Sequence, residues 1–272
     1  MSELATSIAA HVRALRDCNQ RGGRLLSLVD LIDAGTVDLD LAAYLAAVMR
    51  ARGSLLVGAR PGGAGKTALM VALLNFLPND TTIQPIEGPV VLRRGLEDAA
   101  FGRTCYLAHE IGEGFYYAYL WDEQARLFFE LAARGHTIAS NLHADTLPEA
   151  RTQLIVENGV DPAGVDSVTL KVFLRLGRGA NLRTTRWAGH VHESTGPSVP
   201  AGPEWASPDR LVWVGQGRGR FVRQAESRVV SREEEARCRI FLEQLLHADI
   251  RTIEDVRQAV VRDLADTSLR EA

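Results

Sequence analysis

The sequence lacks the features that define several specialised classes of protein. It contains no apolar run of about 18 residues or more, so we expect no transmembrane helix. Segment 1–17 has an early acid and an amphipathic pattern, which is not that of a signal peptide. The three cysteines are few and far apart, which favours a reducing cytoplasm and small buried side chains over disulfides or a zinc site. The net charge of −3 provides no overall basic field for nucleic acid.

Lysine is also scarce. Only two of the 31 basic residues, Lys66 and Lys171, are lysine, and the others are arginine. Lys66 lies in the glycine-rich segment Gly62-Gly63-Ala64-Gly65-Lys66-Thr67. An ammonium is a compact charge on a flexible stem, so it reaches the β- and γ-phosphate oxygens inside a tight loop better than a planar guanidinium does. The segment therefore predicts a P-loop that binds ATP, with Mg²⁺ on the hydroxyl of Thr67.

The residues around this loop favour the same interpretation. Residues 54–57 are a short apolar run suited to a buried strand, and residues 67–77 are helix formers that end at Pro78. Backbone N–H groups of the turn and of the helix N-terminus can then surround a phosphate. The alternative is a glycine-rich turn that holds no ligand. The nucleotide contacts that we predict are Arg60, Pro61, Gly62, Gly63, Ala64, Gly65, Lys66, Thr67 and Ala68.

Position 60 departs from the P-loop pattern, which has glycine where this chain has Arg60. Three interpretations stay open. Arg60 is tolerated because Pro61 fixes the next φ angle, or the loop has lost affinity, or the guanidinium itself reaches a phosphate.

A P-loop ATPase needs a carboxylate at the end of a neighbouring strand. The run 104–109 is mostly apolar and leads to Glu110, which we predict to be the general base or the residue that positions water. Glu113 is the nearby alternative, and an ordinary surface acid is the other interpretation of Glu110. Glu87 ends an earlier candidate strand, where it is either a second acid close to the metal or a solvated turn residue.

One histidine follows the last strand of the predicted core. The segment 135–146 delivers His143 after the run 137–142, and open α/β sheets bind their ligands at the carboxyl ends of strands. We therefore predict that His143 senses the γ-phosphate by a hydrogen bond. The alternative is a structural histidine.

Strands and helices alternate along the middle of the chain, which predicts an α/β fold with a mostly parallel sheet. The expected core strands are 54–58, 81–86, 104–108 and 137–142, and the clearest later helices are 121–134 and 148–157. The expected parts of the chain are an N-terminal helical segment 1–52, a P-loop core 53–178, a β-rich extension 179–230 and a C-terminal helical module 231–272.

Several segments, in chain order over roughly residues 24–178, together resemble the type II/IV secretion and type IV pilus assembly ATPases. These segments are 26–32 with Gly35-Thr36 ahead of the loop, 73–78 after it, 82–87 as a reduced Asp box, 107–111 as the Walker B segment, and 135–144 as the His box. The spacing between the Walker B segment and the His box is the most specific feature of this resemblance.

The resemblance implies a RecA-like ATPase domain that works as a hexameric ring and drives secretion or filament assembly. By matching motif positions it implies that Lys66 and Thr67 bind phosphate and Mg²⁺, that Glu110 is the catalytic acid and that His143 is the sensor. Glu87 carries over more weakly, as a metal-site acid. The implied partners are further copies of the chain and an inner-membrane platform or other secretion or pilus components, which places the protein in the cytoplasm or at the membrane surface.

The chain also departs from this family. Fewer than 60 residues precede the P-loop, where the family has a sizeable N-terminal domain that supplies arginines. The arginine that the family carries shortly after the Walker B acid is absent, because Glu110 is followed by Ile111 and Gly112. The candidate arginines that act on a neighbouring subunit are Arg93, Arg94, Arg103 and Arg134, for which surface solubility is the alternative.

Three functions follow from these patterns. The first is an ATP-hydrolysing motor subunit of a secretion or pilus-like machine. The second is a regulatory or structural protein that binds the nucleotide with weak hydrolysis or none. The third is a nucleic-acid translocase, which the net charge disfavours.

Overall fold

The computed structural model describes residues 3–19, 22–100, 102–114, 118–179, 183–196 and 208–271. Parts of the predicted extension, 180–182 and 197–207, therefore lie outside the described residues. Within the described ranges no helix is long and apolar enough to cross a membrane.

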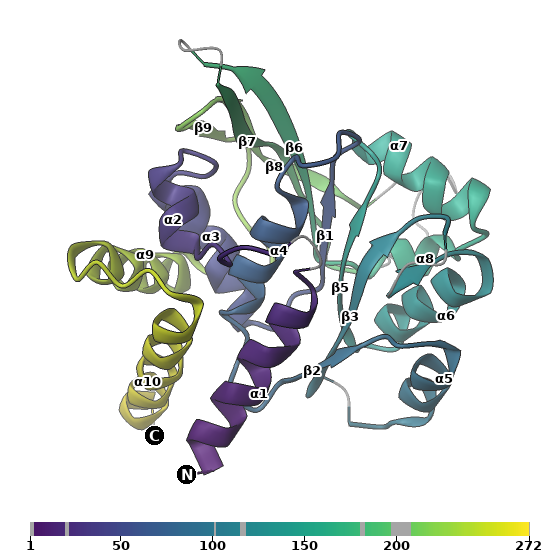
Figure 1. Cartoon of the computed structure of the whole chain (residues 1–272), viewed down its shortest axis with the longest axis horizontal. Coiled ribbons are helices and arrows are strands. Elements are labelled where there is room, and N and C mark those ends of the chain that lie inside the picture. The colour runs from purple at the N-terminus through teal and green to yellow at the C-terminus, as the bar shows by residue number, and fades with distance from the viewer. Residues whose placement is uncertain are drawn as a thin grey trace.

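The nine described strands form one mixed sheet, and helices pack on both of its faces (Figure 1). The strands are β1 (Leu55–Gly58), β2 (Thr82–Pro85), β3 (Thr104–Ile111), β4 (Tyr119–Leu120), β5 (Thr137–Leu142), β6 (Leu170–Arg178), β7 (Thr184–Glu193), β8 (Arg210–Gly217) and β9 (Arg220–Arg223). The helices are α1 (Glu3–Asp17), α2 (Leu28–Asp33), α3 (Leu39–Arg50), α4 (Lys66–Leu74), α5 (Pro89–Glu97), α6 (Asp122–Ala133), α7 (Leu147–Arg151), the π-helical turn η1 (Thr152–Glu157), α8 (Pro162–Asp166), α9 (Arg232–His247) and α10 (Ile253–Glu271).

The strand order is β2-β3-β5-β1-β6-β7-β8-β9, with β4 beside β3. All pairings among β1 to β6 are parallel, whereas β6 with β7, β7 with β8 and β8 with β9 pair antiparallel. The two central strands β1 and β5 are buried along their whole lengths, as expected for parallel strands that are covered on both faces. This confirms the predicted α/β class with a mostly parallel sheet, the architecture expected of a RecA-like P-loop core.

The side chains of β1, β3, β5 and β6 alternate between two separate hydrophobic cores. In β1, Leu55 and Val57 face the core that α1 to α4, α9 and α10 cover, whereas Leu56 faces the core under α5 to α8. In Figure 1 these two helical layers lie on opposite sides of the sheet. The C-terminal helices therefore pack into the first core together with the P-loop helix α4.

The predicted elements differ from the observed ones where a tertiary contact sets the boundary. Strand β3 continues to Ile111, because Glu110 and Ile111 pair with both β4 and β5, so the predicted acid lies inside the strand. The predicted helix 148–157 is a short α-helix followed by a π-helical turn. The β strands after residue 178 extend the core sheet, since β7 pairs with β6 and β6 pairs with β1.

Candidate functional site

The glycine-rich loop connects β1 to α4, at the carboxyl end of the central strand. Gly65 precedes the helix with φ of 96°, and Gly63 has φ of 77°, two left-handed conformations that favour glycine. No described side chain caps the N-terminus of α4. The first N–H groups of this helix therefore point into the loop without a side-chain acceptor, which is the arrangement that attracts an anion.

Lys66, the first residue of α4, directs its ammonium to the strand opposite. Its Nζ lies 2.7 Å from Oε1 of Glu110 and donates a hydrogen bond of 2.9 Å to the carbonyl oxygen of Ala59. The side chains of Lys66 and Glu110 are only 10% and 8% exposed. The structure thus places the lysine and the acid, predicted from separate segments, in direct contact.

An irregularity in β3 brings Glu110 to this position. Leu107 pairs with Ala139 of β5, but the next pair joins Glu110 to Asn141, so β3 contains one more residue than β5 between the two pairs. Such a β-bulge changes the direction in which the following side chains point. In an unbroken register His109, and not Glu110, would pair with Asn141. The bulge therefore determines that a carboxylate faces the P-loop at this point.

Glu110 has polar contacts on both carboxylate oxygens, a hydrogen bond on Oε2 and ion-pair contacts on Oε1. The hydroxyl of Tyr119, on β4, donates to Oε2 at 2.8 Å, and Nε2 of His143 lies 3.1 Å from Oε1. Burial of Glu110 acts to raise its pKa, but the hydrogen bond and charge of Lys66, together with Tyr119 and His143, outweigh burial and lower this pKa. Glu110 is accordingly an ionised, well-oriented carboxylate at neutral pH.

His143 follows β5 and lies half-exposed between the acid and the loop. Its Nδ1 is 3.3 Å from the carbonyl oxygen of Arg60, while its Nε2 faces Glu110. The imidazole therefore bridges the start of the P-loop and the acid strand. The role of phosphate sensor remains a prediction.

Asn141 of β5 lies at the centre of the site, although the sequence analysis gave it no role. Its Nδ2 donates to the carbonyl oxygen of His109 at 2.8 Å and to the hydroxyl of Thr67 at 3.3 Å. Its Oδ1 is buried and has no hydrogen-bond partner among the described residues. A buried carbonyl oxygen without a donor is costly, so this atom marks a place for a water molecule or a hydrated cation next to Thr67.

Arg60 does not adopt a positive φ angle, so the glycine of the P-loop pattern is not needed for the backbone at this position. Its N–H donates to Asp145 at 2.9 Å, and its guanidinium pairs with Glu149 at 3.0 Å. The ion pair holds the Arg60 side chain on the side of His143. A cavity of about 390 Å³ opens there, and its lining residues are Arg60, His143, Pro148, Glu149, Thr152, Gln153 and Glu157.

The other predicted acids lie farther from the loop. Glu87 is exposed after β2, and two strands, β3 and β5, separate β2 from β1. Glu113 is exposed just beyond β3. The assignment of Glu87 to the metal site remains a prediction that no described contact with Thr67 supports.

Four arginines were predicted as candidates for action on a neighbouring subunit, and all four are exposed. Arg93 pairs with Glu123 of α6 at 3.0 Å, and Arg134 pairs with Glu130 of the same helix at 2.6 Å. Their contact with another copy of the chain remains a prediction.

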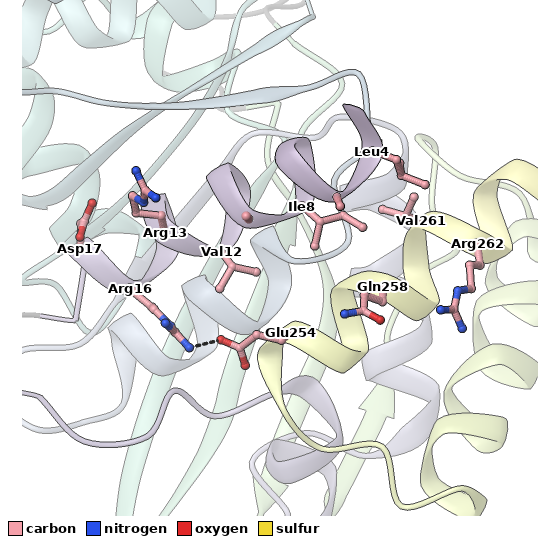
Figure 2. Close-up of a pocket in the computed structure, with 12 residues that line it drawn as sticks. Leu4, Ile8, Val12, Arg13, Arg16, Asp17, Glu254, Gln258, Val261 and Arg262 are labelled. Carbon is pink, nitrogen blue, oxygen red and sulfur yellow. Dashed lines mark hydrogen bonds and ion pairs between the residues drawn. The ribbon is translucent and has the colours of Figure 1, made fainter. Parts of the chain in front are cut away.

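A second hollow lies away from this site, between the first and last helices. A groove of about 630 Å³ runs between α1 and α10, and none of its lining residues belongs to the P-loop, to β3 or to β5. Figure 2 shows Leu4 and Ile8 of α1 facing Val261 of α10, and the ion pair of Arg16 and Glu254 crossing one end. None of the residues that line this groove was predicted to bind nucleotide or to take part in catalysis.

Comparison with known proteins gives matches among solved structures alone, since no family model and no curated protein matches the chain. The VirB11 ATPase of the Brucella suis type IV secretion system, in complex with sulphate, is 19% identical with a TM-score of 0.43, over 61% of this chain and 54% of that one. The ATPase DotB of Legionella pneumophila is 11% identical with a TM-score of 0.43, over 89% and 59% of the two chains. The ATPase DotB of Yersinia pseudotuberculosis is 10% identical with a TM-score of 0.42, over 86% and 62%.

The matched regions span between 54 and 62% of these solved chains. These TM-scores lie below 0.5, so the similarity assigns no function to this chain.

Proposed function

We propose that this protein binds ATP at the loop 60–68 and hydrolyses it. The observation that supports this proposal is the meeting of three segments: Lys66 from the P-loop helix, Glu110 from β3 and His143 after β5. A polyphosphate needs amide donors and a mobile cation, and its hydrolysis needs an oriented acid beside the γ-phosphate. All of these groups lie at one edge of the sheet.

Because Lys66 is paired with Glu110, nucleotide binding would come first and the activation of Glu110 as a base would follow. A triphosphate offers Lys66 a stronger concentration of negative charge than one carboxylate, so the ammonium turns from Glu110 to the phosphates. Glu110 then keeps its burial but loses the partner that lowers its pKa most. Its affinity for a proton rises, which makes it a better base toward a water molecule at the moment when substrate is present.

Thr67 and Asn141 fit a magnesium ion that arrives with the nucleotide. The hydroxyl of Thr67 is a suitable oxygen ligand, and the unpaired Oδ1 of Asn141 can accept a hydrogen bond from a coordinated water. No group of three His, Cys, Asp or Glu in the described parts of the chain could hold a metal by itself, which agrees with a cation held mostly by phosphate and water. When bound, magnesium neutralises the phosphate charge that develops during transfer.

Within this function we propose the narrower role that the sequence resemblance implies. The chain acts as a motor subunit, works as a homo-hexamer, and contacts an inner-membrane platform or other components of a secretion or pilus-like machine from the cytoplasmic side. The support for this role is the order and spacing of the motif segments in the sequence.

A paired binding and turnover assay tests the proposal. We expect the purified protein with Mg²⁺ to bind ATP and to release phosphate. Glu110→Gln should keep ATP affinity and lower kcat by about 100-fold or more, the usual effect of removing a positioned acid–base group. Glu113→Gln, which removes an exposed carboxylate three positions along the chain, is the matched control and should keep wild-type turnover.

Each outcome selects one function. Binding without turnover in the wild type favours a regulatory or structural nucleotide-binding protein, and absence of both contradicts the proposal. A strict monomer in light scattering with ATP contradicts the ring. DNA-stimulated turnover at low salt would instead favour a nucleic-acid translocase.

A further inference from the structure

An arginine from the β extension touches the P-loop from outside the motifs. Arg186 lies on β7, and its Nε donates a hydrogen bond of 2.9 Å to the carbonyl oxygen of Gly63. A Cβ atom placed on Gly65 would lie 3.4 Å from Cδ of Arg186, so the arginine stem also lies against Gly65, the last glycine of the loop. The two residues are 123 positions apart in the sequence, counted between Gly63 and Arg186.

The sheet explains how Arg186 arrives there. Strand β6 pairs directly with the P-loop strand β1, and β7 returns antiparallel beside β6. In Figure 1 this hairpin continues past the end of β1 that carries the loop. A register shift between Phe173 and Leu174 marks a bulge in the hairpin, which increases its local twist.

The charges around the loop distinguish Arg186 from the other cations. Lys66 is paired with Glu110, and Arg60 is paired with Glu149. Arg186 is exposed and forms no ion pair with any described residue. Its Nε is used by Gly63, but both terminal NH₂ groups keep their donors, in the fork geometry that binds phosphate oxygens. Arg186 is therefore a cation beside the loop that no carboxylate of the described residues neutralises, so its guanidinium can bind an anionic ligand.

We propose that Arg186 is a phosphate ligand of the bound nucleotide, contributed by the β6–β7 hairpin of the same subunit. This inference rests on the proposed function, because it assigns a further ligand to the same P-loop. It also gives the β extension a role, since the hairpin then senses whether the loop is occupied.

Two substitutions separate a phosphate ligand from a residue that only holds the loop. Arg186→Gln keeps an amide donor for the Gly63 carbonyl but removes the charge. Arg186→Lys keeps the charge and changes the donor geometry. Arg178→Gln removes an exposed charge from the same hairpin and is the matched control. Each protein is titrated with Mg·ATP by calorimetry, and its thermal unfolding is recorded to confirm that it is folded.

We expect Arg186→Gln to bind ATP at least tenfold more weakly, Arg186→Lys to recover most of that loss, and Arg178→Gln to bind as the wild type does. Wild-type affinity in Arg186→Gln overturns the inference and leaves the proposed function intact. Equal weakening in the Gln and Lys variants also overturns it, in favour of loop geometry alone. A wild-type protein that binds no ATP refutes the proposed function and this inference with it.

Discussion

The ammonium of Lys66 and the carboxylate of Glu110 face each other at 2.7 Å, and both side chains are almost fully buried. A buried ion pair compensates its loss of hydration only when further hydrogen bonds satisfy both groups. Here Ala59 accepts from the ammonium, and Tyr119 donates to the carboxylate. The lysine and the acid of the candidate site are therefore held in place by each other before any nucleotide arrives.

Replacement of Lys66 by alanine should remove most of the ATP affinity. A hydrogen bond to a charged group contributes about 1.5 to 3 kcal/mol, so we expect Lys66→Ala to weaken binding by about 10- to 150-fold, as calorimetry can measure. The remaining Glu110 carboxylate repels the phosphates, which adds to the loss.

Lys171→Met is the contrasting variant, because Lys171 is buried 2.6 Å from Asp209 and contacts no residue of the loop. It should lower the melting temperature and leave the ATP affinity of the folded protein unchanged. Equal ATP affinity in Lys66→Ala and the wild type would contradict the assigned site.

The part of the site that could be predicted from the sequence consists of residues that are adjacent in the chain. The glycine-rich turn, its lysine and its threonine are adjacent in the chain, and the α/β alternation predicts that such a turn lies at a strand end. The same rule placed Glu110 and His143 at the same sheet edge, because the carboxyl ends of parallel strands share one edge.

The site residues that were not predicted reach the site through the pairing of strands, which cannot be recognised from a short stretch of sequence. Tyr119 comes from a two-residue strand, and Asn141 is brought opposite Glu110 by the bulge in β3. Arg186 arrives through the pairing of two strands more than a hundred residues beyond the loop. The amide of Asn141, within the buried strand 137–142, is the signal that could have been used, because a buried amide group needs hydrogen-bond partners.

Asn141 should affect turnover more than binding. Its Nδ2 contacts Thr67, while its Oδ1 is the buried acceptor without a partner. We expect Asn141→Ala to lower kcat by about 10- to 100-fold, since one oriented polar contact to the reacting groups contributes roughly 1.4 to 2.7 kcal/mol. KM for ATP should change little. Ser140→Ala is the control on the same strand, because the Ser140 hydroxyl donates to the backbone carbonyl oxygen of Asn141 and not to a side chain of the site. Unchanged steady-state kinetics in Asn141→Ala would show that the residue only ties β5 to β3.

The stability of the fold should fall in mild acid because of His192. Burial lowers the pKa of His192 from its ordinary value of 6.5 to about 4, aided by the charges of His190 and Lys171 and opposed by Asp209. The unfolded chain then binds more protons than the folded one between these two values. The contribution of His192 is complete above pH 6.5 and is lost as pH falls toward 4, by roughly 3 kcal/mol for a shift of this size.

Urea unfolding at several pH values between 7 and 4.5 measures this effect. His192→Gln has no titrating group at this position, so its free energy of unfolding should depend less steeply on pH than that of the wild type. The difference between the two slopes isolates His192 from other buried histidines such as His11, whose pKa burial also lowers. Parallel pH profiles for the two proteins would contradict the assignment.

A buried arginine connects the last helix to the P-loop helix, and its removal should destabilise the protein without blocking the site. Arg257 of α10 is 1% exposed, and its guanidinium donates to the carbonyl oxygens of Asn75 and Leu77, just beyond the end of α4. Burial lowers its pKa to about 10, so it remains charged at neutral pH. Arg257→Met keeps the apolar stem but leaves these carbonyls without a donor, and we expect a loss of about 2 to 4 kcal/mol in the free energy of unfolding.

Arg262→Met, on the exposed side of the same helix, should change stability by less than about 0.5 kcal/mol. ATP affinity should be preserved in both, because the loop at the other end of α4 is untouched. Equal unfolding free energies for the two variants would mean that α10 packs on the core without support from this arginine.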